Sequence, residues 1–248
     1  MFRFFCPDAD FNQETIHLTN PKEIYHLKNV LRLKVGDSLR IFNGHDQEAE
    51  GRISSLKKNQ VEVTIGVPGI IPITKKDKPA IILACAIPKK GKFETIIEKT
   101  TELGVDEIIP VKTQRTEFKL SQERLKSKQS RFQSVAINAA KQSRRITIPQ
   151  IRPVTDFFPL IKSLNSDELG LIACLSEKIK SLFDIEFKNP SLKKIIALIG
   201  PEGDFTLEEI SQAKDKGFIP ISLGANVLKV DTAAICVVAY LNLFFSKK

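Results

Sequence analysis

Residues 198–205 read Leu-Ile-Gly-Pro-Glu-Gly-Asp-Phe, and residues 222–234 read Ser-Leu-Gly-Ala-Asn-Val-Leu-Lys-Val-Asp-Thr-Ala-Ala. Each run begins where an apolar, β-prone segment ends, at residues 194–199 and 218–223. Gly and Pro at such points turn the chain sharply and expose backbone amides and carbonyls. Because ligands bind at the carboxyl ends of strands in open α/β sheets, we expect the two loops to wall one small-molecule pocket.

The chain lacks the common phosphate-binding motifs. Neither G-x-G-x-x-G nor G-x-x-x-x-G-K-[ST] occurs in the sequence. A pocket built from backbone groups, without a dedicated lysine, suits an uncharged adenine ring and a ribose better than a phosphate chain. The residues alone leave open that the two runs are ordinary strand-to-helix turns.

Hydrophobic periodicity divides the rest of the chain. Short strands at 37–42, 48–54 and 60–65, with helical spacing between residues 21 and 32, predict a small barrel with one helix. A Pro- and Lys-rich linker follows at 67–79. Beyond it, strands at 80–87, 105–111, 170–175, 195–199 and 219–223 alternate with helices at 92–103, 121–141, 206–216 and 233–245. This alternation predicts an α/β fold, with a mostly parallel sheet and helices on both faces.

The net charge of +9 is concentrated in one segment. Residues 75–150 carry 17 Lys/Arg and 8 Asp/Glu, which accounts for the whole excess. A basic block of this kind indicates a polyanionic partner, although a solvated surface with a surplus of charge is the alternative. With no Trp and only two Tyr, contacts to phosphates would dominate over base stacking.

Cysteine and histidine positions argue against a metal site. The four Cys stand far apart in the sequence, three of them in apolar stretches, and the three His all lie in the first fifth of the chain. The apolar N-terminal run is too short for a signal peptide, and no run reaches the length of a membrane span. We therefore expect a cytoplasmic protein with free thiols, no metal and no membrane association.

The two glycine-bearing runs resemble the cofactor loops of SPOUT methyltransferases, and more narrowly those of the ribosomal RNA small subunit methyltransferase E family. That family typically shows I-G-P-E-G-G-F-[ST] and then S-L-G-x-R-I-L-R-x-E-T-A. In this chain Asp204 replaces the last glycine of the first motif, Asn226 and Lys229 replace arginines, and Asp231 replaces glutamate. Further matching pieces lie at 26–32, 99–105 and 138–143, so the resemblance covers essentially the whole chain.

This resemblance implies a fold, a reaction and partners. It implies a SPOUT domain at 73–248 whose last segments form a deep trefoil knot, after a PUA-like β-barrel at 1–72 that recruits RNA. The implied enzyme uses S-adenosyl-L-methionine to methylate N3 of a uridine in 16S rRNA of the small ribosomal subunit. It also implies a homodimer through the C-terminal domain, with the last helix in the interface.

The candidate site residues lie in the two loops, at strand ends and in the basic segment. Glu202 is either a catalytic carboxylate or a residue that orders the first loop, and we favour the second role; we expect Thr232 to cap the last helix. The residues expected at the cofactor are Leu175, Leu198, Ile199, Gly200, Pro201, Glu202, Gly203, Ser222, Leu223, Gly224, Val227, Leu228 and Thr232. Those expected at RNA are Arg32, Lys89, Lys90, Lys92, Arg115, Gln142 and Arg144.

The chemistry leaves the catalytic group open. Uridine N3 carries a proton that must leave before or during methyl transfer, yet no residue identifies itself as the base. Arg115 and Lys229 are the candidates for stabilising negative charge on O2 or O4. Two alternatives remain: a non-catalytic RNA-binding or ribosome-assembly protein on this fold, and a methyltransferase for tRNA or for a ribose 2′-oxygen.

Overall fold

The computed structural model describes residues 1–66, 78–88, 91–116, 122–162, 164–176 and 179–246. Its contacts divide the chain into two compact units. One comprises Met1–Lys76 with Ala140–Ile148, and the other comprises Asp77–Ala139 with Pro149–Lys248. The N-terminal unit therefore includes a segment from the middle of the chain, which the sequence did not indicate.

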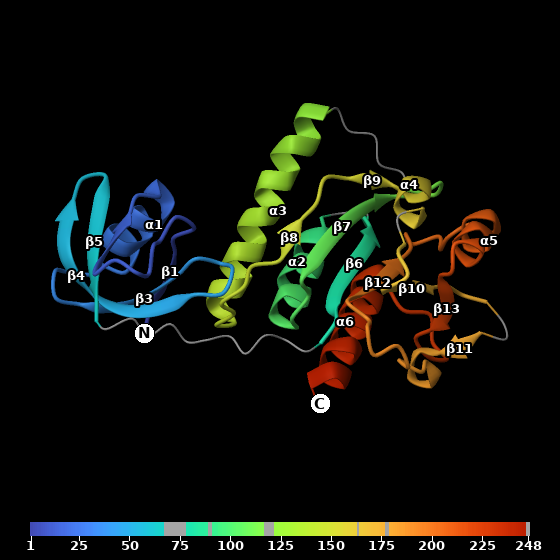
Figure 1. Ribbon diagram of the computed structural model, residues 1–248. Helices are drawn as coiled ribbons and strands as arrows, with labels where there is room; N and C mark the ends of the chain where they lie inside the picture. Colours follow the sequence, from blue (N-terminus) through green and yellow to red (C-terminus); the bar gives the residue numbers. More distant parts are fainter. Residues whose placement is uncertain (67–77, 89–90, 117–121, 163, 177–178, 247–248) are drawn as a thin grey trace. The chain divides into compact units, whose positions relative to one another are not determined.

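The N-terminal unit is a five-stranded sheet in the order β1-β3-β4-β5-β2 (Figure 1). Its core gathers alternate strand residues, together with Ile24 and Leu27 from the helical segment. The short strands and the helical segment are confirmed, whereas β1 and β2 were not predicted. The elements are β1 (Arg3–Phe5), β2 (Thr15–Leu18), α1 (Pro21–Tyr25), the π-helical turn η1 (His26–Val30), β3 (Ser38–Phe42), β4 (Glu48–Lys57) and β5 (Gln60–Ile65).

The buried side chain of Arg3 holds the middle segment to this sheet. Its Nε donates to Oε1 of Glu48 at 2.6 Å. Its terminal nitrogens donate to the backbone oxygens of Ala140 at 3.1 Å and Arg145 at 3.0 Å. Since a buried guanidinium needs both a counter-charge and acceptors for its remaining donors, residues 140–148 complete the packing of the N-terminal unit.

The C-terminal unit is built on an eight-stranded sheet, in the order β11-β13-β10-β12-β6-β7-β8 with β9 beside β7 (Figure 1). Every pairing recorded in this sheet is parallel, which confirms the predicted sheet type. Its strands are β6 (Ala80–Ala86), β7 (Glu107–Lys112), β8 (Gln150–Ile151), β9 (Thr155–Asp156), β10 (Glu168–Ala173), β11 (Lys180–Ser181), β12 (Lys194–Ile199) and β13 (Ile219–Ser222).

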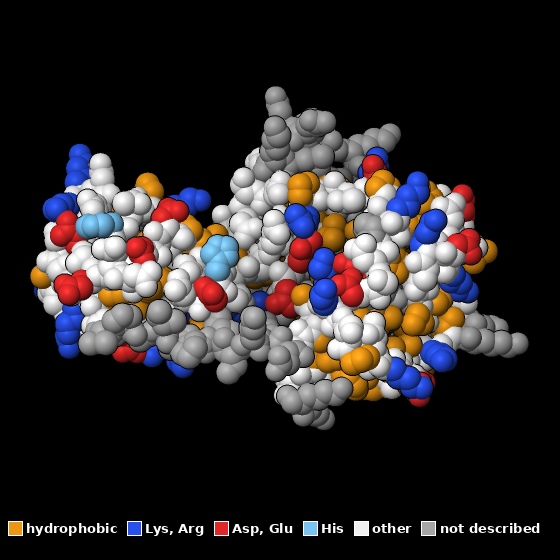
Figure 2. All heavy atoms as spheres, in the orientation of Figure 1, with side chains coloured by type: hydrophobic (Ala, Val, Ile, Leu, Met, Phe, Trp, Pro, Cys, Tyr) orange, Lys and Arg blue, Asp and Glu red, His pale blue; other side chains and the backbone are white. Residues whose placement is uncertain are grey.

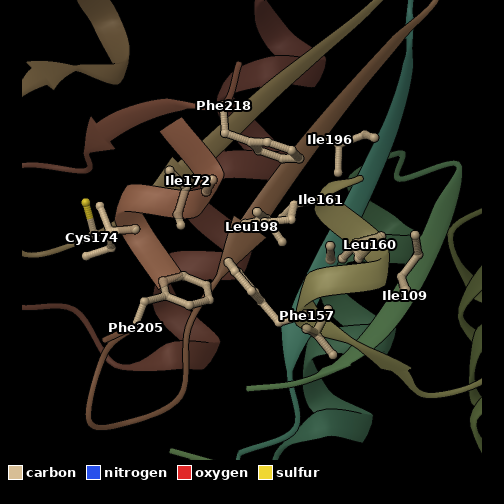
Figure 3. Close-up of a cluster of buried hydrophobic side chains, with 14 of the residues drawn as sticks. Ile109, Phe157, Leu160, Ile161, Ile172, Cys174, Ile196, Leu198, Phe205 and Phe218 are labelled. Atoms are coloured by element: carbon tan, nitrogen blue, oxygen red, sulfur yellow. The ribbon is translucent and has the colours of Figure 1, made fainter. Parts of the chain in front are cut away.

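Helices cover both faces of this sheet. Helices α2 and α6 pack against each other, and α6 lies against β6 and β12. On the other face, α4 and α5 enclose a core in which Ile172, Ile196 and Leu198 meet Phe157 and Phe205 (Figure 3). The helices are α2 (Phe93–Glu102), α3 (Gln122–Gln142), α4 (Phe157–Ile161), the 3₁₀ turn η2 (Leu182–Asp184), α5 (Leu207–Asp215) and α6 (Val230–Ser246).

One predicted helix start is wrong. Helix α6 begins at Val230, and the backbone N–H of Ala233 already donates to the carbonyl of Lys229 at 2.8 Å. Thr232 therefore lies inside the first turn and does not cap the helix.

The trefoil knot stays a prediction. Within the part of the chain that the structure describes, no helix is long and apolar enough to cross a membrane.

Candidate functional site

A cavity of about 370 Å³ lies where three neighbouring strands of the C-terminal sheet end. The strand register brings these ends together, because Ala173 pairs with Ile199 on one side and with Ile221 on the other. The first turn of α6 closes the cavity through Val230 and Ala233. The two loops that the sequence singled out thus meet in one concave site.

The first loop is braced from several sides, beginning with Asp204. This residue has a φ of 60°, in the left-handed region where glycine is most at ease. Its side chain offsets that strain: Oδ2 accepts from the backbone N–H of Leu175 and Oδ1 from that of Phe205, both at 2.8 Å. The replacement of the expected glycine by Asp204 therefore adds hydrogen bonds that a glycine could not make.

Glu209 and Arg115 add two further braces. The carboxylate of Glu209, which is fully buried, accepts from the backbone N–H groups of Gln114 and Thr206, both at 2.9 Å. The second of these contacts belongs to a capping box, in which the Thr206 hydroxyl accepts from the backbone of Glu209. Arg115 donates to the carbonyl of Gly203 and, at 3.4 Å, to that of Phe205. These hydrogen bonds fix the shape of the loop through contacts within the protein.

The second loop is mostly exposed, and among the described residues its side chains form only local hydrogen bonds. Ser222 Oγ accepts from the backbone N–H of Gly224 at 3.2 Å and lies 3.1 Å from the Gly224 carbonyl. Val227, which lines the cavity, is 75% exposed. Gly224 has a φ of 128°, which L side chains rarely adopt.

Charged groups of both signs line the cavity. Asp231 forms an ion pair with Lys92, with Oδ2 and Nζ 3.5 Å apart. Lys229 is exposed at the cavity, with no side-chain partner among the described residues. Burial, assisted by the Asp204 carboxylate, raises the pKa of the Cys174 thiol to about 11. That thiol is therefore neutral at physiological pH and serves as an apolar wall.

Most of the residues predicted at the cofactor line this cavity. They are Leu175, Ile199, Gly200, Pro201, Glu202, Ser222, Leu223, Gly224, Val227 and Leu228. Three others do not. Leu198 lies in the hydrophobic core (Figure 3), Gly203 is exposed next to Arg115, and Thr232 is exposed on α6.

The residues predicted at RNA are spread over both units. Lys92 lines the cavity, and Arg115 braces the first loop. Arg32, Gln142 and Arg144 are exposed in the N-terminal unit, where both arginines have positive φ values of 54° and 60°. Lys89 and Lys90 lie outside the described residues.

Sequence reasoning did not assign several lining residues to the cofactor site. Those are Pro88, Lys92, Ala173, Cys174, Asp204, Ile221, Asn226, Lys229, Val230, Asp231 and Ala233. A signal existed for Ala173 and Cys174, because they directly precede Leu175 at the end of the predicted strand 170–175. Among the described residues, no three His, Cys, Asp or Glu side chains gather as a metal site would require.

Comparison with known families gives two matches. The RNA methyltransferase domain family matches residues 75–242, and the RNA methyltransferase PUA domain family matches residues 18–66. Ribosomal RNA small subunit methyltransferase E of Rickettsia conorii is 35% identical over 93% of this chain and 91% of its own length. The protein of the same name from Synechocystis is 30% identical, over 97% of this chain and 77% of its own length.

Solved structures agree with these sequence matches. A methyltransferase from Legionella pneumophila in complex with the bound cofactor SAM has a TM-score of 0.86 and 31% identity, covering 98% of this chain and 97% of its own. Ribosomal RNA small subunit methyltransferase E from Neisseria gonorrhoeae, bound to S-adenosyl methionine, has a TM-score of 0.85 and 27% identity, covering 98% of both chains.

Proposed function

The chain belongs to the ribosomal RNA small subunit methyltransferase E family, and from this premise we propose that it transfers a methyl group from S-adenosylmethionine to N3 of a uridine in 16S rRNA. Such a substrate implies work in the cytoplasm. The observation that carries the proposal is the cavity at the carboxyl edge of the sheet, walled by the two loops at 200–206 and 222–229.

The cavity fits the cofactor in its chemistry. The apolar side chains of Leu175, Ile199 and Leu228 suit an adenine ring, and the backbone at Gly200 and Gly224 offers hydrogen-bonding groups without side chains in the way. S-adenosylmethionine supplies a methyl group already activated on a positively charged sulfur. The protein has to hold that methyl in line with N3, which is mainly an effect of proximity and orientation.

Of the two cationic candidates, Lys229 suits the developing negative charge better. Arg115 already uses its guanidinium on the carbonyls of Gly203 and Phe205. Lys229 is exposed at the cavity, and its ammonium can turn toward a bound uridine. We assign Lys229 to the stabilisation of charge on O2 or O4, and Arg115 to the shape of the first loop.

We assign RNA recruitment to the N-terminal domain at 1–72 and methyl transfer to the domain at 73–248. Arg32 supports this division, because it is an exposed arginine of the N-terminal domain held in the left-handed backbone region. Arg144 has the same exposure and a similar backbone conformation, and it belongs to the segment 140–148 that packs with the N-terminal unit. Lys92, with the basic segment around it, would add phosphate contacts near the cavity.

A homodimer through the C-terminal domain is part of the proposal. Phe183 packs on Tyr240 at 4.9 Å and Phe187 on Phe244 at 4.8 Å between ring centroids, while Phe183 and Leu243 stay 74% and 63% exposed. Figure 2 shows hydrophobic side chains gathered over the area where α6 and β11 lie in Figure 1. Light scattering should give twice the mass of the 27.8 kDa chain.

Mass spectrometry of 16S rRNA nucleosides from a deletion strain tests the reaction. N3-methyluridine should be absent from that strain and should return with the wild-type gene, but not with a Gly200→Val variant. Unchanged N3-methyluridine would favour the non-catalytic alternative. Loss of a methyl group from tRNA or from a ribose 2′-oxygen instead would identify a different substrate on the same scaffold.

A further inference from the structure

Asp231 lines the cavity with a side chain that is 25% exposed, and one of its two carboxylate oxygens has no hydrogen-bond partner among the described residues. Its Oδ1 is buried, and no donor among the described residues reaches it. An acidic side chain in the first turn of a helix normally accepts a backbone N–H there, or faces water. A buried carboxylate oxygen that does neither keeps its full capacity to accept a donor or to face a positive charge.

The other oxygen of Asp231 is also weakly satisfied. Lys92 Nζ stands 3.5 Å from Oδ2, beyond the 2.7–2.9 Å typical of charged N–H···O contacts. The remaining charged groups on the cavity wall are Glu202, Asp204 and Lys229. Both oxygens of Asp204 accept backbone N–H groups, and Glu202 is exposed. Asp231 is therefore the cavity carboxylate with a buried oxygen still to be paired.

The charge of Asp231 also affects Cys85, at the end of strand β6. Burial is the main cause that raises the pKa of Cys85, with contributions from the carboxylates of Glu202 and Asp231. Cys85 pairs in register with Ile199, the residue before Gly200. The negative charge of Asp231 therefore reaches the strand end at Cys85, where the surrounding apolar atoms screen it less than water would.

Resting on the proposed function, we propose that the carboxylate of Asp231 recognises the positive sulfonium of S-adenosylmethionine. Through this contact the enzyme would distinguish the cofactor from its uncharged product, S-adenosylhomocysteine. The two ligands share the adenosine, the amino group and the carboxylate, so the sulfonium charge and its methyl are what separates them.

The same contact would help product release. In the transfer the S–CH₃ bond breaks and its electron pair stays on sulfur, while the lone pair of uridine N3 forms the new N–CH₃ bond. The N3 proton passes to solvent. Sulfur then has no charge, so the carboxylate of Asp231 keeps only its ion pair with Lys92. The attraction present with the substrate cofactor is absent with the product.

Titration calorimetry with the full chain tests this inference. Wild-type protein should bind S-adenosylmethionine more tightly than S-adenosylhomocysteine. Asp231→Asn keeps the shape and removes the charge, so it should weaken S-adenosylmethionine binding about tenfold, or 1.4 kcal/mol, and leave S-adenosylhomocysteine binding nearly unchanged. Asp215→Asn, at the exposed end of α5, is the matched control and should change neither affinity.

Lys92→Met provides a second variant with the opposite sign. Without its lysine partner, Asp231 should attract the sulfonium more strongly, so the preference for S-adenosylmethionine should rise. Equal losses for both ligands in Asp231→Asn, or a lower preference in Lys92→Met, would overturn the inference while leaving the proposed cofactor site intact. A folded wild-type protein that binds neither ligand would overturn the proposed function itself.

Discussion

The two loops of the cavity are built on opposite principles. The first, at 200–206, is braced by Asp204, Glu209 and Arg115, whose side chains are bonded to its backbone or to neighbouring loops. The second, at 222–229, has most of its side chains exposed, and its side-chain hydrogen bonds among the described residues join only Ser222 and Gly224. One wall is organised by contacts with distant parts of the fold, and the other has only local side-chain hydrogen bonds among the described residues. Pre-organisation on one side lowers the entropy cost of binding, while freedom on the other permits entry and release.

The largest effect should come from filling the first loop. A Cβ on Gly200 would stand 3.1 Å from two ring carbons of Phe205 and 3.3 Å from its backbone nitrogen. In a braced loop neither neighbour can move freely, so Gly200→Val would push side-chain atoms into the cavity. We expect calorimetry to show cofactor affinity reduced by roughly a hundredfold. An affinity within twofold of wild type would mean that the first loop is not the rigid wall.

Removing the buried carboxylate of Glu209 should have the next largest effect, which is on the free energy of unfolding. Glu209→Ala leaves the N–H groups of Gln114 and Thr206 without their acceptor and should lower the free energy of unfolding by about 3 kcal/mol. Glu209→Gln keeps one acceptor oxygen and should cost about half as much. Urea denaturation of the two variants measures this, and equal costs would indicate that the hydrogen bonds do not determine loop stability.

The sequence predicted the strands that lead into both loops but not the difference between the loops. Apolar runs at 194–199 and 218–223 report burial directly, since parallel strands covered on both faces are continuously hydrophobic. Asp204 and Glu209 act on backbone groups of Leu175 and Gln114, which lie far away in the chain. Such contacts leave no periodic signal, so the bracing could not be read beforehand.

The prediction of site residues from the sequence was limited in the same way. Backbone-lined positions such as Gly200 and Gly224 stand out because a glycine directly after a strand marks a sharp turn or a close approach to the backbone. Leu198 was wrongly predicted at the cofactor, because successive side chains of a strand point to opposite faces and that of Leu198 points into the core. Asp231 was missed because an acidic residue in the first turn of a helix is common. Likewise, nothing local indicated that residues 140–148 pack with the N-terminal unit.

Substitutions of Arg115 and Lys229 test the difference between the two loops, because Arg115 braces the first loop and Lys229 lies in the second. Arg115→Ala removes a brace from the first loop, so we expect an unfolding free energy lower by about 1 kcal/mol and cofactor affinity lower by severalfold. Lys229→Ala should leave both quantities unchanged and lower kcat for methyl transfer about tenfold. Thermal melts, calorimetry and single-turnover assays separate these results. The reverse pattern would exchange the roles of the two residues.

The smallest effect should come from a substitution in the second loop. Whether it lowers the cofactor affinity or the melting temperature matters more than its size. Gly224→Ala meets no atom within 4 Å, so its cost is the backbone strain at a φ of 128°, on the order of 1 kcal/mol. If the free loop is loose, it can relax that strain until the cofactor orders it. The cost should then appear as an affinity several times weaker, with an unchanged melting temperature.

Gly217→Ala is the matched control, because Gly217 has a φ of 87° and lies just after α5, away from the cavity. There the strain should lower the melting temperature by a few degrees and leave affinity alone. A lower melting temperature in Gly224→Ala with normal affinity would show that the second wall is as fixed as the first.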